Sequence, residues 1–283
     1  MGELFGPNVM IALAITLGAG IATVFGSFLV VFARHTNTRL LAFGLAFAGG
    51  AMVYVSLVEI FYKAQVAFAQ SLPDKQAYAW ATLWFFVGVM MLVVIDRLVP
   101  NPHASMDSDQ IRSFAGEADL PHAGMTIVDR QREQLLRRVG LMAALAITAH
   151  NLPEGLATFF ATLESPVVGL PLALAIAIHN IPEGVSIAVP VFYATGSKTK
   201  AVLASLISGL AEVVGAVVGY LILAPFLSDA VFGAVFGLIA GAMVYLALDE
   251  LLPASRAYAK GHETVYGMVI GMAAIAASLV LFR

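Results

Sequence analysis

Two six-residue segments combine imidazole, amide and carboxylate side chains within strongly apolar stretches of the sequence. The first is HNLPEG at residues 150–155, and the second is HNIPEG at residues 179–184. In each segment the histidine and the glutamate are four residues apart, so a helix places both on one face, with the asparagine at the edge of that face. These side chains are ligands for divalent transition metals. Two such helices that face each other would provide ligands for one or two cations.

Each segment also contains a proline and a glycine. Pro153 and Pro182 lack an N–H group, so each frees the carbonyl four residues earlier and kinks the helix. Gly155 and Gly184 follow, and they permit close approach of another helix or local unwinding. Irregular backbone at membrane depth is tolerated where it lines a cavity.

Glu212 is a further carboxylate in an apolar stretch, SGLAEVVGAVVG, which contains no basic residue. Gly209 and Gly215 beside it allow another helix to come close. Ionisable groups are costly within a membrane, which makes Glu212 a candidate ion-pathway residue. Glu154, Glu183 and Glu212 cannot all stay ionised in a low-dielectric site without cations or protons. We therefore expect metal binding to weaken at acid pH.

The composition indicates an integral membrane protein. The chain has 283 residues, of which 60% are hydrophobic and 12% are charged, whereas a soluble domain has about 25% charged residues. The net charge of −3 gives no reason to expect a nucleic-acid partner. The absence of cysteine excludes thiolate metal sites and cysteine nucleophiles.

Eight apolar stretches are long enough to cross a bilayer, which needs about 20 residues. They lie at about 7–33, 40–63, 77–98, 137–162, 167–193, 200–224, 229–252 and 263–282. The chain thus divides into helices 1–3 at 1–98, a flexible cytoplasmic loop at 99–136, helices 4–5 with the metal site at 137–193, and helices 6–8 at 194–283. Together they form one transport domain of the all-α class.

The basic residues predict the orientation. With the N-terminus outside, 12 of the 15 lysines and arginines fall in inside loops. This distribution favours a protein with both termini outside.

A second repeat links the two ends of the chain. The sequence AMVY occurs at 51–54 and again at 242–245, and Glu59 then matches Glu250. These segments lie in spans 2 and 7, which run in opposite directions in the predicted topology. A 3+2+3 arrangement follows, in which spans 1–3 and 6–8 are inverted repeats around a central pair. Inverted repeats are typical of alternating-access transporters, although chance similarity between Gly- and Ala-rich helices is the simpler alternative.

The doubled HNxPEG motif, eight spans and a long loop after span 3 resemble the ZIP family of zinc and iron permeases, and most closely its bacterial ZupT-like branch. The resemblance covers nearly the whole chain and implies a binuclear site between spans 4, 5 and 6. It implies that the first metal uses His150, Glu154, His179 and Glu183. The second metal would use Asn151, Asn180 and Glu212, with Glu154 and Glu183 shared as bridges.

The resemblance also implies residues along the transport path. Asp249 and Glu250, near the cytoplasmic end of span 7, match the family's exit ligands. Pseudo-symmetry places Glu59 toward the outside, where it is either an entrance residue or an interfacial glutamate that faces water. The loop departs from many family members because it is not rich in histidine, with only His103 and His122. A disordered connector is therefore the plainer interpretation of this loop.

The sequence thus predicts a secondary transporter that imports divalent metal ions, with no resident cofactor and no enzymatic activity. The site without thiolate suits Zn²⁺, Fe²⁺, Mn²⁺, Co²⁺ or Cd²⁺, and no phosphate-binding loop for ATP is present. The alternative is an intramembrane zinc hydrolase, but such an enzyme needs a separate general base, and the sequence offers none beside the motif. A receptor or a structural helix bundle is a third interpretation. The expected location is a bacterial inner membrane, with the bilayer and metal ions as partners. The resemblance also allows a homodimer.

Overall fold

A computed structural model describes residues 6–32, 38–98, 148 and 151–282 of the chain. In these ranges every regular element is a helix. The described residues contain seven spans that are long and apolar enough to cross a membrane, so the prediction of an all-helical, multi-pass membrane protein is confirmed. The predicted loop, with His103 and His122, and the first part of the fourth predicted span lie outside the described residues.

The described helices begin and end close to the predicted spans. Their bounds are α1 Pro7–Phe32, α2 Thr38–Val55, η1 Ser56–Ile60, α3 Phe61–Ala69, α4 Asp74–Leu98, α7 Pro166–Thr195, α8 Lys198–Leu223, η3 Ala224–Phe226, α9 Asp229–Leu246, η4 Ala247–Leu251, α10 Leu252–Tyr258 and α11 Glu263–Phe282. The described part of the fourth predicted span is helical over 151–164.

Short polar caps separate the later helices. Gly196 ends α7 with a φ of 64°, a left-handed conformation that glycine adopts without steric cost. The side chain of Ser197 accepts a hydrogen bond from the backbone N–H of Lys200 at the start of α8. Ser228 accepts one from the N–H of Val231 at the start of α9. These caps pair N–H groups that the first turn of a helix otherwise leaves free.

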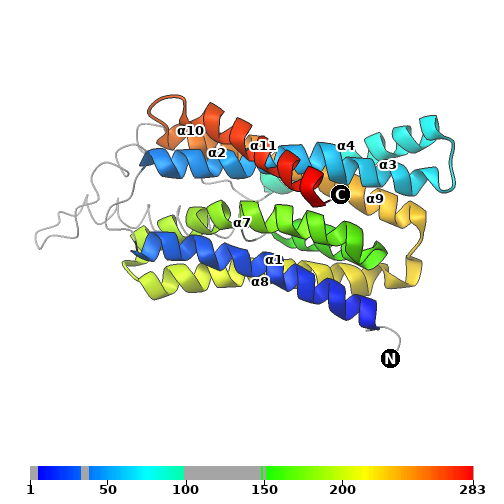
Figure 1. Ribbon diagram of the computed structural model, residues 1–283, viewed down its shortest axis with the longest axis horizontal. Helices are drawn as coiled ribbons and strands as arrows, with labels where there is room; N and C mark the ends of the chain where they lie inside the picture. Colours follow the sequence, from blue (N-terminus) through cyan, green and yellow to red (C-terminus); the bar gives the residue numbers. More distant parts are fainter. Residues whose placement is uncertain (1–5, 33–37, 99–147, 149–150, 283) are drawn as a thin grey trace, which may run out of the picture.

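The helices form two groups, which Figure 1 shows as two layers. In the first group α1 packs on α7 and α8, and α7 packs on α8; the helix at 151–164 joins it through contacts with α8. In the second group α2 packs on α11 and α10, while α9 packs on α4 and α3. Helix α7 also contacts α2 and α11, so it links the two groups.

Glycines bring the backbones of the first group together. A Cβ atom at Gly20 of α1 or at Gly209 of α8 would overlap the backbone of the other glycine. One at Gly184 of α7 would overlap the backbone of Thr23 in α1. Small residues that permit such approach are typical of helix interfaces in membranes. The predicted close approach is thus present, but α7 stays α-helical through Gly184, so the predicted local unwinding is absent from it.

Spans 2 and 7 each contain a π-helical segment that the sequence analysis did not predict. The segments η1 and η4 lie 191 residues apart, which is also the offset of the AMVY repeat. A π turn inserts an extra residue into a helix and is frequent at functional sites. Glu59 lies in η1, and Asp249 and Glu250 lie in η4. The proposed path residues therefore occupy equivalent irregular turns.

Two glycines at contacts between helices are also 191 residues apart. A Cβ atom at Gly50 of α2 would overlap the backbone of Met268 in α11, and one at Gly241 of α9 would overlap that of Phe85 in α4. The pair α2–α11 thus corresponds to the pair α9–α4. Helices α2 and α9 run in opposite directions, as their colours show (Figure 1). This relation is the one that the predicted inverted repeat requires.

Polar side chains are buried and large apolar ones are exposed, the reverse of a soluble protein. Trp80, Phe86 and Met90 of α4 are each about half exposed, at 46%, 57% and 56%. Thr23 and Ser208, by contrast, are fully buried at 0%. A surface of this kind is stable against lipid hydrocarbon, whereas the interior can accommodate polar chemistry.

Candidate metal centre

Glu154, His179 and Glu183 lie together inside the first helix group. One ligand atom of each lies within 4.8 Å of the other two, and all three side chains are buried. Among the described residues no other three such side chains come this close. His179 Nε2 is 3.3 Å from Glu154 Oε2. Two ligands of one zinc ion, each about 2.1 Å from it, lie at most about 4.2 Å apart, so a small inward movement would complete a coordination shell.

Two helices that are consecutive along the chain position these three ligands. Glu154 comes from the helix at 151–164, and His179 and Glu183 come from one face of α7. Gly155, the residue after Glu154, lies against the backbone of Glu212 in α8. The close contact between the helix at 151–164 and α8 therefore brings Glu212 beside Glu154, His179 and Glu183.

Glu212 is fully buried at 0% exposure and is held by Asn180. The Asn180 Nδ2 group donates hydrogen bonds to the backbone oxygen of Ala19, at 2.9 Å, and to Glu212 Oε1. Because both N–H groups of the Asn180 side chain are used in these hydrogen bonds, its Oδ1 atom stays available to a metal ion. Glu183 interacts electrostatically with both Glu154 and Glu212, so the three carboxylates form one cluster.

Asn151 is oriented in the same way from the other motif. Its Nδ2 group donates to the backbone oxygen and to the Oγ atom of Ser208, each at 3.1 Å. Asn151 is fully buried at 0% exposure, and its Oδ1 atom has no hydrogen-bond partner among the described residues. Both asparagines thus leave an amide oxygen available as a ligand.

The cluster contains several buried polar atoms without a hydrogen-bond partner among the described residues. They are Asn151 Oδ1, Glu154 Oε2, His179 Nδ1, His179 Nε2, Asn180 Oδ1, Glu183 Oε1 and Glu212 Oε2. A buried polar atom left unpaired costs about 1–3 kcal/mol, and more when it is charged. These seven oxygen and nitrogen atoms, from six residues, fit bound cations. Cations would pair these atoms and offset the carboxylate charges.

Of the seven predicted ligands the structure thus brings six together. The seventh, His150, lies outside the described residues. The sequence analysis did not predict Ser208 and Ala19 as partners of the asparagines. Ala19 contributes a backbone oxygen, which any residue at that position would supply, and Ser208 contributes its Oγ atom as well as its backbone oxygen. Neither residue is a typical metal ligand.

Comparison with known proteins identifies the family of this chain. The family model described as ZIP Zinc transporter matches residues 6–278. The chain belongs to the ZIP zinc transporter family. It is 63% identical over 278 residues to the zinc transporter ZupT of Xanthomonas axonopodis pv. citri, covering 98% of this chain and 96% of the relative. It is 60% identical over 276 residues to those of Stenotrophomonas maltophilia and Neisseria meningitidis, covering 98% of this chain and 97% of each relative.

Membership of the ZIP family makes the chain a membrane transporter and not an enzyme. The alternative of an intramembrane hydrolase is therefore not supported. The expectation of a multi-pass membrane protein agrees with the apolar helices described above.

The two ends of the predicted ZIP path differ in charge. At one end Glu59 is buried and pairs with Lys63 of the same helix. At the other end Asp249 is exposed and Glu250 is half-buried, and Asp96 of α4 interacts electrostatically with both. The sequence analysis missed Lys63 and Asp96. Asp96 stands next to Arg97 at the end of the third predicted span, so the argument that singled out Glu212, a carboxylate in a stretch without a basic residue, does not apply to it.

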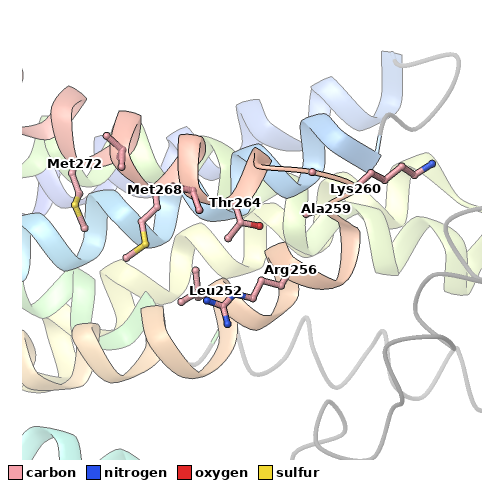
Figure 2. A pocket seen from close by; sticks show the side chains of 10 residues that line it. Leu252, Arg256, Ala259, Lys260, Thr264, Met268 and Met272 are labelled. Carbon is pink, nitrogen blue, oxygen red and sulfur yellow. The ribbon is translucent and has the colours of Figure 1, made fainter.

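A groove of about 490 Å³ opens between α10 and α11, away from the metal cluster. Figure 2 shows Arg256 reaching into it from α10 and the thioethers of Met268 and Met272 from α11, with Lys260 at its end. Its lining contains no carboxylate and no imidazole. The two positive charges would repel metal cations, so this groove is not a second candidate metal site.

Proposed function

We propose that this ZIP-family protein imports divalent transition-metal ions, with Zn²⁺ first among them, into the cytoplasm. The buried group of Glu154, His179 and Glu183 carries the proposal, because it places carboxylate and imidazole ligands between membrane-spanning helices. The names of the similar proteins, all zinc transporters, support Zn²⁺ as substrate. Fe²⁺, Mn²⁺, Co²⁺ and Cd²⁺ suit the same ligand types. Mg²⁺ and Ca²⁺ prefer shells made only of oxygen.

The site would hold two ions. The first would bind His150, Glu154, His179 and Glu183, and the second would bind Asn151, Asn180 and Glu212, with Glu154 and Glu183 as bridges. The unpaired amide oxygens of both asparagines support the second position. Two dications would also offset the negative charges of the clustered carboxylates. Without cations or protons, three carboxylates this close together could not all stay ionised.

The protein would cross the membrane eight times, with both termini outside and a 3+2+3 inverted-repeat arrangement. The equal offset of the π segments η1 and η4, and of the glycine contacts around α2 and α9, supports the repeat. The basic residues support the orientation, because most of them fall in loops that this topology places inside. The central pair of spans, at 137–193, then carries most of the metal ligands.

Transport would proceed by alternating access. The first helix group would hold the metals while the second group, with spans 2, 3, 7 and 8, moves against it. The packing of α1 and α8 on α7, and of α2 on α11 and α9 on α4, supports this division, with α7 at the boundary where it contacts α2. Glu59 would lie at the entrance, and Asp249 and Glu250, with Asp96, at the exit. A cation that enters a cell with an inside-negative potential gains about 2.3 kcal/mol per charge per 100 mV, which would favour import.

The bacterial relatives support a bacterial inner membrane as the location. A homodimer stays a prediction.

The first test is Zn²⁺ uptake into sealed proteoliposomes by the wild type and by Glu183→Ala. The matched control is Asp74→Ala, which removes an exposed carboxylate at the start of α4. We expect wild type and Asp74→Ala to take up Zn²⁺ and Glu183→Ala to lose uptake. Competition by Cd²⁺, Fe²⁺ and Mn²⁺ then ranks the metals. Wild-type protein that binds metal but does not move it would contradict the proposal.

A further inference from the structure

Lys63 carries a buried positive charge that the transport scheme above does not use. Its Nζ atom is 3.4 Å from Glu59 Oε1, and the two side chains are 7% and 8% exposed. Both residues lie within the span Ala42–Ala69. A lysine within a membrane span is costly, although less so toward the end of the span, where Lys63 lies, than at its centre. A pair that is neutral overall reduces this cost, but an apolar residue at both positions would avoid it altogether.

Other carboxylates lie at the same end of the molecule. Burial raises the pKa of Glu164, the Lys63 ammonium lowers it, and Asp229 raises it. Lys63 therefore acts on Glu164 as well as on Glu59, and Asp229 adds a further negative charge nearby. A region with several carboxylates attracts cations from solution, and Lys63 is a built-in cation within it.

The internal repeat places a lysine after the glutamate at one end of the path but not at the other; at the other end the nearby positive charge is Arg97 of α4, beside Asp96. Glu59 corresponds to Glu250, each within its π segment. With the same offset of 191 residues, Lys63 corresponds to Ala254. The glutamate in η1 thus has a lysine one turn later, whereas the glutamate in η4 has an alanine there and Asp249 beside it. The repeat supplies the carboxylate at both ends and the ammonium at one.

We propose that Lys63 is a specificity-determining residue of transport, whose ammonium occupies the side of Glu59 that an incoming metal would otherwise bind. This inference rests on the proposed function, in which Glu59 lies at the entrance. With Lys63 in place, Glu59 attracts a cation but does not hold it firmly. The metal then passes on to the cluster around His179, which binds it with nitrogen as well as oxygen ligands.

Weak binding at the entrance matters most for the wrong cations. Carboxylate oxygens alone suit Mg²⁺ and Ca²⁺, whereas a site with imidazole favours Zn²⁺ and its neighbours in the first transition row. An entrance carboxylate without Lys63 would therefore retain Mg²⁺ and Ca²⁺, which are far more abundant than Zn²⁺. Lys63 keeps these ions from blocking the path.

The test is initial Zn²⁺ uptake into proteoliposomes with increasing Ca²⁺ or Mg²⁺, for wild type, Lys63→Met, Lys63→Arg and the double variant Glu59→Gln/Lys63→Met. We expect Lys63→Met to be inhibited at about tenfold lower Ca²⁺ or Mg²⁺, which corresponds to about 1.4 kcal/mol of tighter binding. Its KM for Zn²⁺ and its maximal rate should both fall. Lys63→Arg keeps the charge and should behave like wild type.

The double variant separates this role from a structural one. It removes both charges, so it leaves no buried charge unpaired and is expected to fold even if Lys63→Met does not. We expect it to be insensitive to Ca²⁺ and Mg²⁺ and to have a raised KM for Zn²⁺, because the entrance ligand is lost. The inference would be overturned if the double variant had the same inhibition by Ca²⁺ and Mg²⁺, and the same KM for Zn²⁺, as the wild type. Wild-type protein without Zn²⁺ uptake would instead contradict the proposed function itself.

Discussion

At the scale of single residues, Glu212 shows how the site divides its ligand atoms. Asn180 donates a hydrogen bond to Oε1, and Oε2 is left without a partner among the described residues. One oxygen thus orients the carboxylate while the other is available to a metal. Glu212 belongs to the proposed second ion position but not to the first, so the two positions can be separated by substitution.

We expect Glu212→Gln to reduce Zn²⁺ binding from two ions per chain to one and to slow uptake strongly. Glutamine keeps the size of the side chain and can still accept from Asn180, but it removes the negative charge. The control Ser186→Ala removes only a hydrogen bond of 3.0 Å to the Pro182 oxygen within α7. Isothermal titration of the purified protein measures the stoichiometry. Two ions bound to Glu212→Gln would show that Glu212 is not a ligand.

The clustered carboxylates also predict a dependence on pH. Metal ligands must lose their protons before they bind, and Glu154, Glu183 and Glu212 are buried together. Protons and metal ions therefore compete for the same oxygens, and a lower pH favours the protons. We expect the affinity for Zn²⁺ to fall by at least about tenfold between pH 7.5 and pH 5.5, in titrations of detergent-solubilised protein. Equal affinity at both values would contradict this expectation.

The sequence predicted these residues because helix geometry places residues four apart on one face, and because ionisable groups are costly in lipid. It could not predict which partner each side chain has. The pairing of Asn151 with Ser208 joins residues 57 positions apart, and no periodic pattern encodes such a contact. The sequence likewise did not show that Lys63 is buried, since its burial depends on helices distant in sequence.

At the scale of helices, the glycine after each glutamate sets the spacing of the site. Gly155 lies against the backbone of Glu212, and Gly184 lies against that of Thr23. Any side chain larger than hydrogen at these positions must push two helices apart. The metal ligands next to them would then move relative to one another.

We expect Gly155→Ala to lower both thermal stability and Zn²⁺ uptake. Overpacking of this kind costs about 1–3 kcal/mol, and it separates Glu154 from Glu212. The control is Gly18→Ala in α1, because a Cβ atom there has nothing within 4 Å. Alanine also favours a helix over glycine. Melting curves and uptake assays on the two variants measure the difference, and equal behaviour would mean that this contact does not set the geometry of the site.

The ends of the described helices followed closely from the apolar stretches, because membrane thickness fixes the length of a span. The π segments did not follow from composition. Both consist of ordinary helix-compatible residues, SLVEI and ALDEL, and their extra residue depends on packing against neighbouring helices. Their equal position in the repeat became visible only once the helices were seen in space.

At the scale of the whole molecule, the two helix groups meet where α7 contacts α2. A Cβ atom at Gly44 of α2 would lie 3.8 Å from the Cβ of Pro182 in α7, which is about the mean Cβ separation of a disulfide. Within the second group, a Cβ atom at Gly49 of α2 would lie 3.4 Å from that of Leu251 in η4. Because the chain has no cysteine, introduced pairs form the only disulfides.

We expect oxidation of Gly44→Cys/Pro182→Cys to stop Zn²⁺ uptake and reduction to restore it, because the bridge ties together the two groups that alternating access must separate. Oxidation of Gly49→Cys/Leu251→Cys should leave uptake largely unchanged, since it joins elements that move together. The single variant Pro182→Cys measures the effect of losing the proline. Continued uptake by the fully oxidised first pair would contradict alternating access between these groups and would favour a channel, in which ions pass without such a movement.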